Sequence, residues 1–184
     1  MATNEINTPG SSVQNIVSYF ASNGIQKSNK FSITITPPSA LKAYTGEVFA
    51  TSIQTPSRSI LYYPDTMNPS GPIIQVPLRR LYDDRFIIEF MVDEKWNIAS
   101  FFQKWMDLIT SDTTPKLASV VRYYDDITGT IVISALDPKN ETRKTITLYG
   151  AWPKTIIPNT MSNDMVNQYL TLMVDMNYRY SEYT

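Results

Sequence analysis

The sequence predicts a mainly β protein, with two packed antiparallel sheets in a sandwich- or barrel-like arrangement, one flanking α-helix and a short N-terminal helix. Two observations lead to this prediction. Apolar and polar residues alternate with a period of two in several segments, which is typical of half-buried strands. Turn-forming residues separate neighbouring segments, which favours hairpins over crossover connections. The length of 184 residues is within the usual size of a single domain.

The first 29 residues are predicted to form an arm on a β domain that occupies residues 30–184. The arm begins with a mainly polar segment of ten residues that ends in Pro9-Gly10, and Ser11 or Ser12 would be a suitable N-cap for a short helix. The apolar residues of this helix have i, i+3, i+4, i+7 spacing: Val13, Ile16, Val17 and Phe20. Two interpretations remain open, in which the helix packs on its own domain or on a neighbouring subunit.

The first strand of the domain is predicted from Phe31 to Thr36, because three apolar residues alternate with polar ones before Pro37-Pro38. The other strands are predicted at Val48 to Gln54, Phe86 to Val92, Val120 to Tyr124, Thr130 to Leu136, Thr145 to Tyr149, and Leu170 to Tyr180 without a break. Two hairpin-type turns are predicted between them, at 125–129 and 137–140.

One interior helix is predicted from Asp93, which is a good N-cap residue. Its apolar residues form a wide stripe at helical spacing: Ile98, Phe101, Phe102, Trp105, Met106, Leu108 and Ile109. A stripe of this kind indicates a helix that packs on a sheet and contributes to the core.

Residues 56–77 contain five of the 12 prolines of the chain together with several apolar and aromatic residues. Proline disfavours a central strand, whereas apolar residues disfavour a disordered linker. A projecting hairpin or loop with an adhesive tip fits both facts, and long loops in compact domains are usually functional. The alternative is a loop that folds back over its own core.

The composition excludes most catalytic chemistry. The chain has no cysteine and no histidine, which rules out disulfides, thiolate nucleophiles and Ser-His or Cys-His pairs. Two acidic pairs, Asp83-Asp84 and Asp125-Asp126, leave a carboxylate hydrolase as a weak hypothesis, because adjacent residues on an extended segment point to opposite faces. The six glycines are isolated, so no phosphate-binding pattern is present. We expect no enzymatic activity, no cofactor and no metal site.

The charge balance points away from nucleic-acid and membrane binding. Sixteen basic residues against 17 acidic ones give a net charge of -1, which provides no basic surface for gripping phosphates. The longest uncharged stretch, residues 6–26, is too polar to span a bilayer, and it lacks the basic start of an export signal. The 12 tyrosines are suited to interfaces. Self-assembly is therefore the leading class of function.

An ordered set of segments resembles the tail tube proteins of contractile-tailed, T-even-like bacteriophages and related contractile injection systems. The set consists of the segment from Gln75 to Glu94, a helix with Phe102 and Trp105, Val121-Arg122-Tyr123, Gly150-Ala151-Trp152-Pro153, and a long alternating C-terminal strand. Order and spacing agree from about Phe31 to Tyr180. The Pro-rich segment 56–77 and the polar arm differ from the usual family pattern.

This resemblance implies a structural virion protein rather than an enzyme. In that family, six copies form a ring whose inner wall is a continuous β-barrel, and the rings stack into a tube inside a contractile sheath. DNA would pass through the lumen without specific binding. The implied partners are other copies of the chain and the sheath and baseplate proteins, with no membrane. The implied location is the virion tail, and the host cytoplasm during assembly. Acidic residues are expected on the lumen side, where a six-fold ring would repeat their charge.

On this reading the functional residues are contact residues. The tip with Tyr62, Tyr63, Pro64 and Met67 is the candidate for stacking on the next ring, and the arm with Val13, Ile16, Val17 and Phe20 is the second candidate. Deletion of residues 60–74 is expected to spare the fold and abolish tube growth.

Several alternatives stay open. The chain could be the repeating tube subunit, a baseplate-proximal tube initiator, or the tube protein of an injection system. A different class is a monomeric ligand-binding β-sandwich module, with Trp152 or tyrosines as its platform. A carboxylate hydrolase would lose activity on Asp83→Asn or Asp125→Asn.

Overall fold

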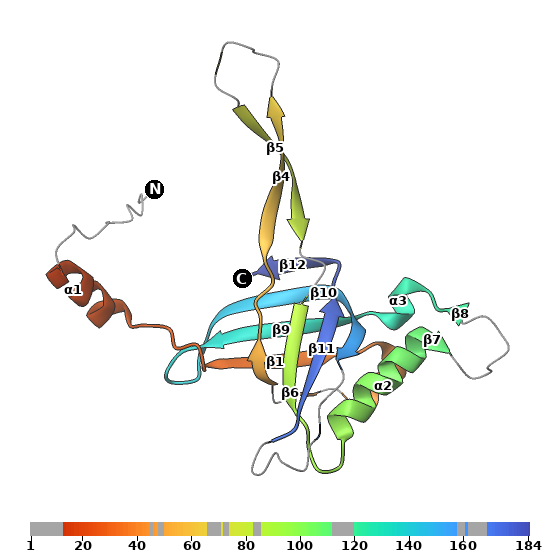
Figure 1. The fold of residues 1–184 in the computed structure, drawn as a ribbon. Coiled ribbons are helices and arrows are strands. Elements are labelled where there is room, and N and C mark those ends of the chain that lie inside the picture. Colours follow the sequence, from red (N-terminus) through yellow and green to blue (C-terminus); the bar gives the residue numbers. More distant parts are fainter. Residues whose placement is uncertain are drawn as a thin grey trace.

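The computed structural model describes residues 13–44, 46–47, 50–65, 71, 74–82, 86–111, 120–157, 161 and 169–184. Figure 1 shows a β domain from which a helix and a hairpin extend. The helices are α1 (Val13–Asn23), the 3-10 helix η1 (Ser39–Tyr44), α2 (Asn97–Ile109) and α3 (Tyr124–Ile127). The strands are β1 (Phe31–Thr36), β2 (Gly46–Glu47), β3 (Ala50–Ile53), β4 (Arg58–Asp65), β5 (Ile74–Tyr82), β6 (Phe86–Met91), β7 (Thr110–Ser111), β8 (Val120–Val121), β9 (Gly129–Leu136), β10 (Thr142–Ile157), β11 (Thr171–Asn177) and β12 (Tyr180–Tyr183).

The main sheet is antiparallel and has the strand order β2-β1-β9-β10-β11-β6-β3, with β12 also paired to β10. Strand β10 belongs to both halves of this sheet. Its first part pairs with β9 and β12, and its last part, from Trp152 to Ile157, pairs with β11. Register shifts interrupt the pairing near Gly150, which has a φ of 64°, and near Lys154. These irregularities increase the local bend. The sheet therefore folds over along β10 into two layers, which confirms the predicted fold class.

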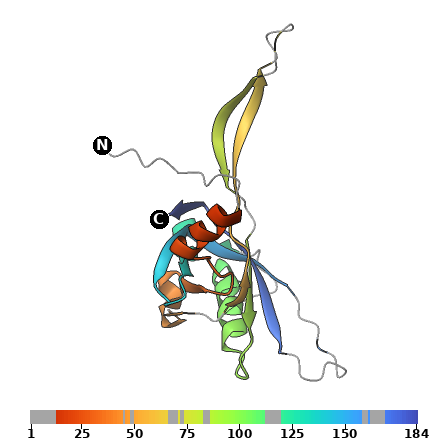
Figure 2. The same ribbon diagram turned by 90° about the vertical axis from the view of Figure 1, so that its left-hand side faces the viewer.

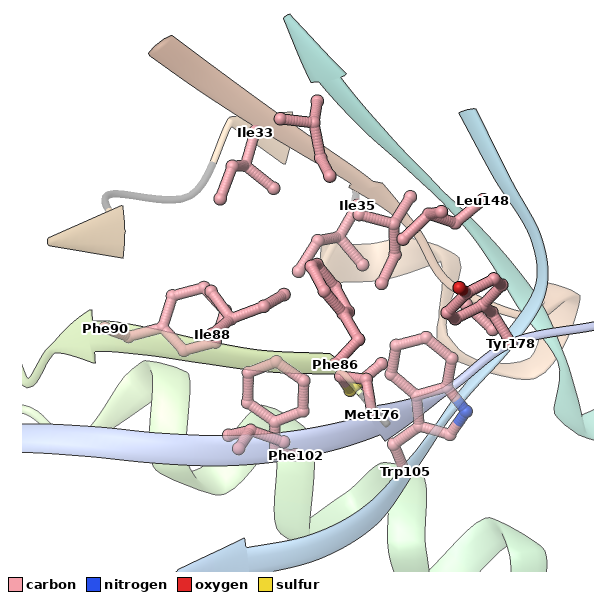
Figure 3. Close-up of a cluster of buried hydrophobic side chains, with 14 of the residues drawn as sticks. Ile33, Ile35, Phe86, Ile88, Phe90, Phe102, Trp105, Leu148, Met176 and Tyr178 are labelled. Carbon is pink, nitrogen blue, oxygen red and sulfur yellow. The ribbon is translucent and has the colours of Figure 1, made fainter. Parts of the chain in front are cut away.

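The core lies between these layers and is closed by α2 (Figure 3). Alternate residues of β1 and β6 point into it and are at most 1% exposed, namely Ile33, Ile35, Phe86, Ile88 and Phe90. Leu148 of β10 and Met176 of β11 complete the sheet side, and Phe102 and Trp105 come from α2. The Phe90 and Phe102 rings are 5.1 Å apart between centroids, so the helix packs directly on the sheet. The stripe of α2 is core, as its spacing predicts.

The first part of the sheet agrees closely with the sequence prediction. Strand β1 has the predicted bounds, β9 begins one residue before its predicted start, and β3 covers the centre of the predicted segment 48–54. The turn between β9 and β10 is built around Asp137, whose carboxylate accepts hydrogen bonds from the Lys139 and Glu141 amides and pairs with Arg143 at 2.8 Å. The backbone N–H of Glu141 and the Arg143 guanidinium together hold the pKa of Asp137 below its ordinary value of 3.8.

The N-cap residue of the interior helix is Trp96, three residues after the predicted Asp93. Asp93 still supplies a capping hydrogen bond, because its Oδ1 accepts the Asn97 N–H at 2.9 Å, but the residues between them form a turn. This turn ends at Trp96, which has a left-handed φ of 56° and donates its N–H to the Asp93 carbonyl oxygen. A cap separated from its helix by a turn is not visible in sequence spacing alone.

Three further predictions are wrong in part. The predicted strand Val120 to Tyr124 is only the short β8, which pairs with β7, and the predicted hairpin turn at 125–129 is the helix α3 followed by the start of β9. This α3 turn is placed by the core, because Trp105 donates its indole N–H to the Ile127 carbonyl oxygen at 2.8 Å. The predicted final strand breaks at Tyr178 and Arg179: β11 pairs with β6 and with the last part of β10, whereas β12 pairs with the first part of β10.

Candidate assembly surfaces

The Pro-rich segment forms a two-stranded hairpin, β4 and β5, that projects from the β domain (Figures 1 and 2). An isolated hairpin is marginally stable in water unless another surface packs on it. Tyr62 is 53% exposed and Tyr63 is 56% exposed, and Pro64 is also exposed. Met67 lies outside the described residues. The projecting position leaves these side chains accessible to a partner.

The register of the hairpin separates its two faces. Tyr63 pairs with Val76, and Ile60 pairs with Arg80, whereas Tyr62 pairs with Pro77. Paired residues share a face and side chains alternate along each strand, and the register shift between Leu61 and Tyr62 leaves Leu78 without a strand partner. Ile60 and Tyr62 therefore lie on one face, whereas Leu61, Tyr63, Ile74 and Val76 lie on the other. We call this second face the apolar hairpin face, and these four members are each at least 37% exposed. Exposed apolar patches of this kind mark interaction sites.

The base of the hairpin is anchored to the C-terminal strand β12. Arg58 donates to the Ser181 carbonyl oxygen at 2.8 Å, and its guanidinium lies 3.6 Å from the centroid of the Tyr183 ring. The Tyr183 hydroxyl in turn donates to the Pro56 carbonyl oxygen at 2.9 Å. Guanidinium stacking and charge-assisted bonds are directional contacts. They give the hairpin a defined direction with respect to the sheet.

The sequence analysis missed this anchor and the division into faces. It selected the tip around Tyr62 and Tyr63 but did not include Leu61 or Val76. Ile74, Val76 and Leu78 recur with a period of two in the sequence, but the register shift between Leu61 and Tyr62 is not visible there, so alternation alone does not assign the faces. Pro77, between Val76 and Leu78, favours loop structure instead.

The second candidate surface is helix α1, which extends away from the β domain in Figure 1. Val17 is 61% exposed and Phe20 is 44% exposed, and they share one face by their spacing. Val13 and Ile16 belong to the same helix, but their side chains lie outside the described part of the chain. A helix of 11 residues is marginal in water without tertiary packing.

A groove with a volume of about 650 Å³ opens between β3 and the β1, β9, β10 and β12 side of the domain. Its apolar floor includes Phe31, Ile53 and Ile133, and lysines such as Lys27 and Lys144 also line it. The sequence analysis did not predict this groove. No short-range pattern could have shown it, because its walls come from strands at both ends of the chain.

The residues of the enzyme hypothesis do not form a site in the described structure. Asp125 and Asp126 are exposed on α3, and Asp83 and Asp84 lie outside the described residues. Within the described ranges, no cluster of three or more acidic side chains could hold a metal ion.

None of the helices described here is both long and apolar enough to cross a bilayer. The ligand-binding alternative placed its platform at Trp152 or at tyrosines. Trp152 is half-buried, and the rings of Tyr149 and Tyr180 stack on each other with their centroids 4.8 Å apart.

A family model described as phage tail tube protein matches residues 26–184. The chain belongs to the phage tail tube protein family. The match begins after α1, so this tail tube domain includes both sheets, α2 and the projecting hairpin. A search of curated protein sequences gave no significant match.

Solved structures with the same fold come from contractile injection systems. A chain of the anti-feeding prophage baseplate has 12% identity and a TM-score of 0.65, covering 87% of this tail tube family chain and 95% of its own length. A chain of an extracellular contractile injection system, in a sheath-tube complex in the extended state, has 13% identity and a TM-score of 0.59, with coverage of 91% and 96%. A chain of the anti-feeding prophage tube-terminating cap has 13% identity and a TM-score of 0.60, with coverage of 87% and 91%.

Proposed function

We propose that this chain is a tail tube subunit that assembles into stacked hexameric rings and forms the conduit for DNA delivery inside a contractile sheath. The observation that carries the proposal is the tail tube family match over residues 26–184. A sheet with a folded, two-layered form suits this role, because strands from neighbouring copies can continue a wall and remove its edges. On this proposal the chain acts through contacts between copies and performs no catalysis.

The apolar hairpin face is the proposed contact between successive rings. It projects beyond the β domain, so it can reach a copy in the next ring without moving the sheets (Figure 1). Its members Tyr63 and Ile74 are 56% and 61% exposed in the single chain. Burying such side chains is favourable by about 1.5 to 3 kcal/mol each. A head-to-tail contact of this type is open-ended and builds a tube.

The other proposed partners follow from the role. The outer surface of the tube would contact sheath proteins, and its ends would contact baseplate proteins. DNA would pass through the lumen without specific binding, and acidic residues are proposed to lie on the lumen side. The protein would reside in the virion tail and in the host cytoplasm during assembly.

A pair of single substitutions on β5 tests the stacking contact. Val76→Asp places a charge on the apolar hairpin face, and Gln75→Asp places the same charge on the neighbouring position of the opposite face. Tube length measured by negative-stain electron microscopy should fall sharply for Val76→Asp and less for Gln75→Asp. Both variants should keep the wild-type far-ultraviolet circular dichroism. Tubes of normal length from Val76→Asp would contradict the proposal.

A second candidate function is a tube initiator at the baseplate end. The baseplate chain with a TM-score of 0.65 favours it, since that chain belongs to the baseplate of its own machine. Copy number separates the two roles, because a tube subunit repeats along the whole tail whereas an initiator forms a ring at one end. Quantitative mass spectrometry of purified particles, calibrated on the sheath protein, should give a copy number close to that of the sheath for the tube subunit.

A further inference from the structure

Helix α2 closes one side of the two-layered domain, whereas none of the residues that line the groove belongs to a described helix. On one side α2 inserts Phe101, Phe102 and Trp105 into the core, and each of them is at most 3% exposed. On another side the groove leaves apolar residues of both layers accessible, among them Ile53 of β3 and Phe31 of β1. A groove of about 650 Å³ with an apolar floor is large enough for several side chains. Within the described part of the chain, no helix covers it as α2 covers the core.

Helix α1 has the complementary chemistry. It carries no charged residue, and Val17 and Phe20 lie exposed on one face. Because buried charges are costly, an uncharged helix is better suited than a charged one to an apolar floor. Residues 1–12 contain one charged side chain, Glu5, which is opposite in sign to Lys27, Lys30 and Lys144 around the groove. Residues 1–23 therefore bring no basic side chain to this lysine-bearing surface.

The chain between α1 and the domain is fixed at the groove itself. Gln26 donates its side-chain amide to the Leu136 carbonyl oxygen at 2.7 Å, and the Leu136 N–H donates to the Lys30 carbonyl oxygen. The Lys30 ammonium also donates to Asn140 Oδ1 at 2.8 Å. These bonds make residues 26–30 one wall of the groove, so only Gly24 and Ile25 separate the helix from that wall.

The direction of α1 is set by Gly24. This residue has a φ of 75° and donates its N–H to the Phe20 carbonyl oxygen, which is the geometry of a glycine C-cap. The helix consequently leaves the domain sideways in Figure 1. A second copy of the chain that places its α1 in this groove buries the apolar surfaces of both.

We propose that the groove between β3 and the β1, β9, β10 and β12 side receives helix α1 of a second copy of this chain. The contact joins two different surfaces, so it is head-to-tail and can repeat around a closed ring. This inference rests on the proposed tube function, because that function supplies the neighbouring copy. To that function it adds the surface on which α1 binds. It links adjacent copies independently of the apolar hairpin face.

Disulfide trapping tests the contact without background, because the chain has no native cysteine. Val17→Cys and Ala135→Cys are made in separate chains and mixed during tube assembly, followed by mild oxidation. Ala135 lines the groove and is half-buried. The matched control replaces Val17→Cys by Ser22→Cys, which lies on the opposite side of α1. Mass spectrometry of the cross-linked peptides identifies which positions are joined.

The expected result is a covalent dimer joined through positions 17 and 135, with several-fold less product from the Ser22→Cys control. Equal yields from both helix positions would overturn the proposal, and so would tubes that form without any 17–135 linkage. A chain that carries both Val17→Cys and Ala135→Cys distinguishes binding to a second copy from binding within one chain. An intrachain disulfide alone would show that α1 binds its own groove. Tubes without linkage would leave the proposed function intact, whereas absence of the chain from the tail would reject that function.

Discussion

Replacing Trp105 by Phe tests how the core helix and α3 are held together. Trp105 is completely buried and packs against Phe101 and Phe102, with ring centroids 5.5 Å and 6.3 Å apart. Its indole N–H is also a hydrogen-bond donor to the Ile127 carbonyl oxygen, at 2.8 Å. Phenylalanine keeps an aromatic ring in the core but removes this donor and part of the buried volume.

The expected loss has two parts. A buried carbonyl left without its donor costs about 1 to 3 kcal/mol. The smaller ring adds about 1 kcal/mol for lost transfer energy and the cavity, since complete truncation of a buried Phe or Trp to Ala costs about 3 to 5 kcal/mol. We therefore expect Trp105→Phe to lower the free energy of unfolding by about 2 to 4 kcal/mol.

Urea unfolding of the unassembled chain, followed by far-ultraviolet circular dichroism, measures this loss through the midpoint and the slope. The matched control is Trp96→Phe, because Trp96 is 41% exposed. Its change should stay within about 0.5 kcal/mol. A Trp105→Phe variant that is as stable as the control would refute the reasoning.

Three further substitutions test individual contacts. A Cβ at Gly129 would lie 2.3 Å from the Thr36 carbonyl oxygen, so Gly129→Ala should destabilise the fold by about 1 to 3 kcal/mol in urea unfolding, and an unchanged midpoint would contradict this. Asp137→Asn should remove a contribution to stability that depends on pH. Because the pKa of Asp137 is lowered in the fold, this contribution is present above the ordinary pKa of 3.8 and is lost as pH falls through the lowered value. Thermal unfolding from pH 2 to 7 should show the two proteins converging at the acid end, and a constant difference would argue against the Arg143 pair. Asp93→Ala removes the cap of α2 and should cost about 1 kcal/mol in thermal unfolding, whereas no change in Tm would show that the turn alone starts the helix.

The elements that the sequence predicts well are those with one buried face. In β1 and β9 the inward residues alternate strictly, because one side of each strand packs on the core and the other does not. In α2 the buried positions Phe101, Phe102 and Trp105 follow helical spacing for the same reason. Burial on one side imposes a period, and the period is visible in the sequence.

The elements that the sequence predicts poorly depend on contacts from distant parts of the chain. Strand β10 continues through Gly150 and Pro153, two residues that usually end strands, because β9, β11 and β12 all pair with it. The break at Tyr178 and Arg179 falls where the chain passes from the last part of β10, paired with β11, to its first part, paired with β12, although the apolar alternation continues across it. Pairing partners, rather than local pattern, determine these bounds.

The assembly surfaces show the same division. The exposed residues Tyr62, Tyr63, Val17 and Phe20 were found from unusual local composition, since apolar side chains occur in segments that do not build the core. The apolar hairpin face depends on the β4–β5 register, and the groove depends on how the sheet folds over. Neither can be obtained without the tertiary structure.

High-resolution electron microscopy of the native particle, with the chain identified from side-chain density, tests the central claim most directly. We predict that six copies of this chain form each ring of the inner tube, with the β4–β5 hairpin between successive rings. A tail whose tube is built from a different protein, with this chain absent from it, would contradict the account.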